Sequence, residues 1–245
     1  MLIRPEPDGS FLAIGQASHA WISGQLARAW GNERFGAVEP WEEVCLGAEQ
    51  HDVGWTLWDL EPTLNHDSGL PHTFIELALE EKLGLWSGAA KKVLAQSRYA
   101  ALLVSMHGTA LYERWPPDDP EARRMAERFI ESEQRFQEQI LQTGLDRDVV
   151  RRNQQLVFAW DYISLALCLN WAPTQVKAVP TLDGHVTLDL DRGGALDPWP
   201  FEDDRIAVRA EGRRLPGRFE DEGSMREALN SADWVTLNFE LRARG

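Results

Sequence analysis

Residues 158–173 read FAWDYISLALCLNWAP and mark a change in the pattern of the chain. The apolar residues of this stretch recur at helical spacing, as they do in most of the chain before it. After Pro173, short alternating runs dominate, and these are typical of strands. We therefore expect a helical domain over residues 1–172, with short N-terminal strands, and a β-rich unit over residues 173–245. The predicted fold class is mainly α, a helical bundle with a small β-rich C-terminal unit (α+β overall).

Within this outline the spacing of apolar residues predicts individual elements. Helices are expected over residues 16–31, 40–53, 73–84, 88–113, 120–143 and 146–170. Strands are expected over 186–190, 205–209 and 234–239, with a short helix over 225–232. Residues 1–4 and 10–15, joined by Asp8-Gly9, predict a hairpin whose strands pair with the late strands.

Composition excludes several classes of protein. The chain has 245 residues, of which 43% are hydrophobic and 26% are charged. It has no run of about 20 apolar residues and no signal-peptide layout, so we expect a cytoplasmic protein without a membrane partner. A formal charge of -14 argues against a nucleic-acid partner. Two cysteines cannot form a disulfide framework. A small-molecule substrate is therefore expected, and formation of a homo-oligomer is left open.

Five ionisable residues fall on the apolar faces of four predicted helices: His19, His51, Asp52, His107 and Asp161. Asp161 lies in the middle of the most apolar helix. An ionised carboxylate there costs several kcal/mol unless it is paired, hydrogen-bonded or bound to a cation. No arginine or lysine lies one helical turn from it. Three inward histidines with two inward aspartates therefore predict a metal centre.

The order of these residues resembles the HD-domain superfamily of metal-dependent proteins. The resemblance covers roughly residues 16–170 and rests on His19, on His51-Asp52 in AEQHDVGW (48–55), and on Asp161 in FAWDYI (158–163). More narrowly, the chain resembles an uncharacterised prokaryotic family of HD type. The motifs that suggest this family are Glu61-Pro62, Gly69-Leu70-Pro71 and Pro198-Trp199-Pro200-Phe201.

The resemblance implies one or two divalent metal ions per chain. Iron or manganese suits a ligand set of imidazoles and carboxylates, and zinc or nickel is an alternative. His19, His51 and Asp161 would bind one ion, Asp52 would bridge, and His72 and His107 would bind a second ion. His66 is the rival of His72 for that role. The predicted catalytic residues are His51, Asp52 and Trp55.

The sequence departs from the superfamily at one position. Many HD phosphohydrolases have a lysine that contacts phosphate where this chain has Trp55. Three tryptophans close to the expected ligands are expected to form the wall of the pocket: Trp55, Trp58 and Trp160. Arg114 is expected to bind an anionic group of the substrate. The primary hypothesis is a metal-dependent hydrolase that cleaves a phosphate ester with a metal-bound hydroxide. The alternatives are a di-iron oxygenase that cleaves C–C or C–P bonds, and a non-catalytic metal-binding or regulatory module.

Overall fold

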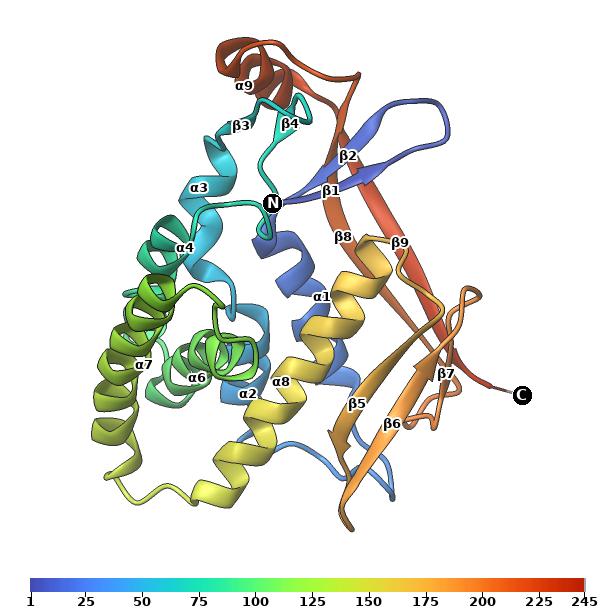
Figure 1. Ribbon diagram of the computed structural model, residues 1–245. Helices are drawn as coiled ribbons and strands as arrows, with labels where there is room; N and C mark the ends of the chain where they lie inside the picture. Colours follow the sequence, from blue (N-terminus) through green and yellow to red (C-terminus); the bar gives the residue numbers. More distant parts are fainter. Residues whose placement is uncertain (245) are drawn as a thin grey trace.

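The computed structural model describes residues 1–244 and combines a helical layer with one large curled sheet (Figure 1). Its seven strands follow the order β1-β2-β8-β9-β7-β6-β5. Helices α1 and α8 lie against the sheet, and the remaining large helices pack on their outer side. About 47% of the chain is helical. The architecture is therefore an α/β fold.

The elements have the following bounds. The helices are α1 (Gln16–Ala29), α2 (Trp41–Glu49), the 3-10 turn η1 (Val53–Trp55), α3 (Thr56–Leu60), α4 (Leu79–Trp86), α5 (Ala89–Val93), α6 (Arg98–Arg114), α7 (Pro120–Leu141), α8 (Arg147–Cys168) and α9 (Glu222–Ser231). The sheet contains β1 (Leu2–Pro5), β2 (Phe11–Ile14), β5 (Thr174–Pro180), β6 (His185–Leu190), β7 (Ala195–Asp197), β8 (Arg205–Leu215) and β9 (Trp234–Ala243). Strands β3 (Leu64–Asn65) and β4 (Leu70–Pro71) form a separate small hairpin.

Strands from the two ends of the chain share the sheet. The N-terminal hairpin β1–β2 turns at Gly9, whose φ of +84° suits glycine. Strand β2 then pairs antiparallel with β8, with Phe11 opposite Leu215. The predicted pairing of the N-terminal hairpin with a late strand is thus confirmed. The pair β7–β9 is parallel, with Ala195 opposite Arg242.

The prediction of a mainly α, HD-like bundle with a small β-rich unit is wrong. The sheet is large, and its inner face shares one hydrophobic core with the helices. Ile22 on α1 and Ile163 on α8 belong to the same core cluster as Val208 on β8 and Leu241 on β9. The sequence predicted that the N-terminal strands pair with late ones, but alternation along the chain does not reveal how many strands join one sheet or that helices cover its inner face. The last residue of the predicted unit, Gly245, lies outside the described residues.

Several predicted helices are shorter or broken. The range 88–113 divides into α5 and α6, because the Ser97 side chain accepts a hydrogen bond from the Ala100 backbone N–H and starts a new helix. The range 40–53 ends at Glu49, so His51 and Asp52 lie in the turn that follows α2. The range 73–84 begins only at Leu79. Strand β5 was not predicted, and it contains a bulge between Val176 and Val179.

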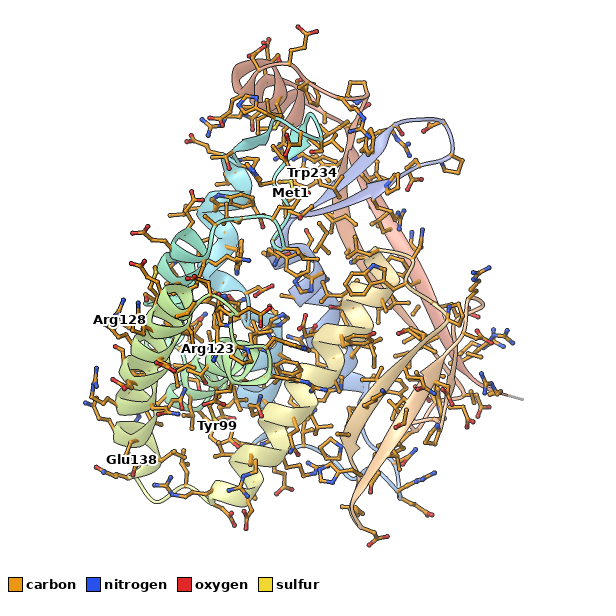
Figure 2. The ribbon with its side chains drawn as sticks, viewed as in Figure 1. Met1, Tyr99, Arg123, Arg128, Glu138 and Trp234 are labelled. Atoms are coloured by element: carbon orange, nitrogen blue, oxygen red, sulfur yellow. The ribbon has the colours of Figure 1, made fainter. Side chains whose placement is uncertain are left out.

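Helix α7 shows the amphipathic pattern expected of it. Phe129 and Ile140 are buried, whereas Arg128 is exposed and lies on the outer side of the helix (Figure 2).

Among the described residues, none of the helices combines the length and the apolar character needed to cross a membrane.

Truncating a residue of the shared core tests the architecture. Leu241 on β9 is completely buried in the cluster that also holds α1 and α8. We expect Leu241→Ala to lower the free energy of unfolding by about 2–5 kcal/mol, because it leaves a cavity in that core. Leu57→Ala is the control, since Leu57 is 71% exposed and should change stability by less than about 0.5 kcal/mol. Urea titrations, followed by circular dichroism and by tryptophan fluorescence, measure the free energy of unfolding of both variants. Helices that melt separately from the sheet would contradict a shared core.

Candidate metal centre

Five buried ionisable side chains meet between four segments of the chain. His19 comes from α1, His51 and Asp52 from the turn after α2, His107 from α6 and Asp161 from α8. Their exposed fractions lie between 0% and 7%. Among the described residues, no lysine or arginine forms an ion pair with either aspartate. Among the described residues, the ion pairs of the two buried carboxylates are thus formed with imidazoles.

The carboxylate of Asp161 lies among all three histidines. Its Oδ1 is 3.4 Å from Nε2 of His51 and 3.7 Å from Nδ1 of His19, and its Oδ2 is 3.7 Å from Nε2 of His107. Oδ2 of Asp52 is 2.7 Å from Nε2 of His19 and 3.7 Å from Nε2 of His51. Two groups of possible ligands result: His19, His51 and Asp161, and His51, Asp52 and His107. Within each group the ligand atoms lie within 4.8 Å of one another.

Hydrogen bonds outside the cluster fix the tautomers of two histidines. The hydroxyl of Ser164 donates to the backbone oxygen of Asp161, so its oxygen accepts from Nδ1–H of His19 at 2.9 Å. Nδ1–H of His51 donates to the backbone oxygen of Ala48 at 2.7 Å. In the neutral form both rings therefore direct the lone pair of Nε2 toward the carboxylates. This is the arrangement in which histidines bind metals, with the other ring nitrogen held by a neighbouring group.

The metal-free cluster leaves buried polar atoms without partners. Nε2 of His51 and Nδ1 of His107 have no hydrogen-bond partner among the described residues. An unpaired buried polar atom costs about 1–3 kcal/mol. Nε2 of His19 and Oδ2 of Asp52 lie 2.7 Å apart, and a cation bound beside them would interact with both atoms. The donor set and these unpaired atoms fit a divalent metal ion.

Burial and mutual charges shift the pKa values of the cluster. Burial disfavours the charged form of His51, but the Asp52 and Asp161 carboxylates outweigh it and raise the pKa of His51 to about 9. Burial and the charge of His51 lower the pKa of His107 to about 4. Burial favours the neutral acid form of Asp161, yet the close, positively charged imidazole of His51 lowers its pKa to about 2. At neutral pH the metal-free cluster therefore holds its proton on His51.

The backbone after α2 is shaped to hold the pair His51-Asp52. Gly54 lies against the backbone of Leu85, where an added Cβ would stand 2.2 Å from the carbonyl oxygen. Only glycine fits such an approach. On the other side, a carboxylate oxygen of Asp59 accepts a hydrogen bond from the backbone N–H of Gln16 at 2.5 Å. This contact fixes the start of α1, one turn before His19.

The structure does not bring every predicted ligand into the cluster. His72 lies beside the β3–β4 hairpin, where its Nδ1 is 2.9 Å from the hydroxyl of Thr63, and it belongs to neither group of possible ligands. The rival His66 is exposed. His107 does join, 4.6 Å from His51 between ring centroids. Helical spacing had placed only His107 on an apolar face, whereas His72 was predicted from its position in the chain after the His-Asp pair.

The predicted substrate residues take different positions. Trp55 is buried in the wall of the cavity that reaches the cluster, and Trp58 packs edge-on against it at 5.8 Å. Trp160 is not part of this wall, because it is buried in the core against Trp30. Arg114 lines a neighbouring groove of about 530 Å³. Its guanidinium lies 5.1 Å and 5.7 Å from the ring centres of Trp115 and Phe158.

The cavity that reaches the cluster has a volume of about 490 Å³. Four of the five clustered residues line it: His19, Asp52, His107 and Asp161. Sequence reasoning missed Lys82 on α4, which also lines the cavity and lies in a charged segment with no distinguishing motif. A cavity of this size suits a small organic molecule.

Fold and cluster together define an α/β protein with a candidate metal centre buried between helices. The chain belongs to a family described as a protein of unknown function (DUF3891), whose model matches residues 1–217. The matched range contains all five clustered residues. No curated protein and no solved structure matches the chain.

Removing the hydroxyl that holds His19 tests the geometry of the centre. We expect Ser164→Ala to weaken Mn²⁺ binding by about 10–100-fold, because His19 loses the partner that fixes its tautomer. Isothermal titration calorimetry measures the affinity. Ser23→Ala is the matched control: Ser23 is also buried, but its hydroxyl has no hydrogen-bond partner among the described residues. Equal affinities of the two variants would argue against His19 as a ligand.

The proton on His51 predicts a pH dependence of metal binding. A metal must displace this proton below the raised pKa of about 9. The apparent affinity should therefore rise about tenfold per pH unit between pH 6.5 and 8.5 and level off above pH 9. Titrations with Mn²⁺ in a series of buffers, corrected for buffer binding, measure this slope. An affinity independent of pH would show that His51 is not a ligand.

Proposed function

We propose that the protein is a metal-dependent hydrolase that acts on a phosphate ester of a small molecule. One observation carries the proposal: two overlapping groups of nitrogen and oxygen ligands lie at the base of a cavity of small-molecule size. A protein that needed only stability would gain little from two carboxylates buried among helices. Such clusters of groups with shifted pKa values are typical of functional sites.

The ligand chemistry favours iron or manganese, and zinc or nickel also suits it. The five side chains offer imidazole nitrogens and carboxylate oxygens, while the thiols of Cys45 and Cys168 are buried elsewhere in the core. His51 belongs to both groups, so the arrangement supports one ion or a closely spaced pair. When bound, a divalent ion lowers the pKa of a coordinated water and polarises a phosphoryl oxygen.

The other residues of the cavity supply binding and orientation. Trp55 lines the cavity with its indole ring, and its buried N–H has no partner among the described residues. The large aromatic wall keeps bulk water from the cluster, which strengthens electrostatic interactions there. A relationship to the HD superfamily is part of the proposal, because the clustered residues follow its order along the chain: His19, His51-Asp52 and Asp161.

A second candidate function is a di-iron oxygenase that cleaves a C–C or C–P bond. Two observations favour it: the two ligand groups adjoin and contain two carboxylates that can bridge a pair of ions, and the cavity wall carries little positive charge for a polyphosphate. Such a reaction takes O₂ as a co-substrate. A regulatory module that binds a metal without catalysis is the remaining alternative.

Metal analysis and activity assays distinguish these candidates. The protein is purified anaerobically without chelators, analysed by plasma mass spectrometry and assayed with bis(p-nitrophenyl) phosphate. We expect a bound divalent metal and a turnover that disappears with EDTA and in Asp161→Asn. Two irons with a spectroscopic change on exposure to air, and no ester cleavage, would favour the oxygenase. A protein that retains no metal and takes up none would overturn both.

His107 reports whether the centre holds two ions. His107 belongs only to the second group of ligands, with His51 and Asp52. If two ions bind, His107→Ala should reduce the metal content from about two to about one per chain and abolish turnover. The helix should persist, because alanine is a strong helix former. A large loss of stability with unchanged metal content would instead identify His107 as a packing residue.

A further inference from the structure

The cavity above the cluster is walled mostly by apolar side chains. Aromatic rings form the largest part of this wall: Phe74, Trp86, Tyr112, Trp115, Phe158 and Trp171. Two of these rings touch the cluster directly, since the ring centres of Trp86 and Phe158 lie 5.6 Å and 5.2 Å from that of His107. The apolar wall thus extends to a candidate ligand, His107.

Apolar side chains are also exposed around the mouth. Ile75 is 63% exposed, Trp115 58% and Trp171 40%. All three line the same cavity. A group of exposed large apolar side chains at one opening is typical of a ligand site, because a bound molecule removes them from water. The wall and the mouth therefore match a ligand with a substantial apolar body.

One cationic side chain lines the cavity. Nζ of Lys82 donates a hydrogen bond to the backbone oxygen of Ile75 at 3.0 Å, which leaves two of its three N–H groups for a ligand. Its partly buried position lowers the pKa of Lys82. One divalent ion would balance the charges of Asp52 and Asp161, so Lys82 adds the positive charge that favours an anion. The buried Oε1 of Gln16, which also lines the cavity, has no partner among the described residues.

We infer that the cavity binds an amphipathic monoanion, a small molecule whose single anionic group meets Lys82 and the cluster while its apolar body lies against the aromatic wall. The identity of that group as a phosphate ester rests on the proposed function. The volume of about 490 Å³ suits a molecule with a fused aromatic ring system or a short branched hydrocarbon. Polyphosphorylated nucleotides do not fit, because their several charges would face one lysine and a wall of rings.

A binding experiment tests this inference without requiring turnover. The probe is 2-naphthalenesulfonate, which has an apolar body and an anionic group that a phosphate hydrolase does not cleave. Isothermal titration calorimetry compares it with 2-naphthylmethanol, which lacks the charge, and with methanesulfonate, which lacks the rings. Each is titrated into the protein in the presence and in the absence of Mn²⁺. We expect one site per chain and an affinity for the probe at least about tenfold higher than for either fragment.

Paired variants assign the two halves of the site. Lys82→Gln should weaken binding of the sulfonate about tenfold and leave that of the alcohol unchanged, whereas Lys82→Arg should retain it. Trp115→Ala should weaken both aromatic probes about tenfold. Lys91→Gln and Trp234→Ala are controls, because both residues are exposed and lie outside the cavity lining. Figure 2 shows Trp234 beside the N-terminal hairpin.

Several results would overturn the inference. One is an affinity for 2-naphthalenesulfonate no higher than for methanesulfonate, and another is an unchanged affinity in Lys82→Gln. A loss of affinity in Arg114→Gln instead of Lys82→Gln would place the anion in the neighbouring groove. A different result would refute the proposed function and leave the inference standing. This result is a protein that binds the probe as expected but takes up no metal and cleaves no ester. A hydrolase that shows no preference for the amphipathic probe would refute the inference alone.

Discussion

Two buried carboxylates impose the main constraint on this structure. Asp52 and Asp161 are almost completely buried and share their surroundings with three histidines and no ion-paired lysine or arginine among the described residues. Burying one ionised carboxylate is costly, and burying two side by side is more so unless a cation lies near. The helices that carry them must therefore meet at one point. Helix α1, helix α6, helix α8 and the turn after α2 all converge there.

Hydrogen bonds and a close backbone approach around the cluster hold these segments together and orient the histidines. Ser164 connects His19 on α1 to the backbone of Asp161 on α8, so one hydroxyl joins two helices at the cluster. Ala48 orients His51 through its carbonyl oxygen, and Gly54 allows the turn to approach Leu85. These contacts are local and rigid, and they place the Nε2 atoms of His19 and His51 toward the same carboxylates. Preorganisation of this kind is what a metal site requires.

The sequence predicted the cluster better than it predicted the fold. Helical spacing places His19, His107 and Asp161 on inward faces, and that inference depends only on local geometry. His72 shares no such face, and it lies outside the cluster because the β3–β4 hairpin holds it near Thr63. The fold class failed for a related reason. Strands β5 and β7 were not predicted, and no local period shows that seven strands form one sheet that packs against α1 and α8.

The sheet order also has a consequence for biosynthesis. Helix α1 carries His19 near the beginning of the chain, yet it packs against strand β8, which starts at Arg205. A ribosome makes this strand only after most of the polypeptide has emerged. Helix α1 also packs against α2 and α8, and the last clustered residue, Asp161, lies on α8. The complete ligand set is therefore synthesised before the late strands, which then add the part of the sheet against which α1 packs.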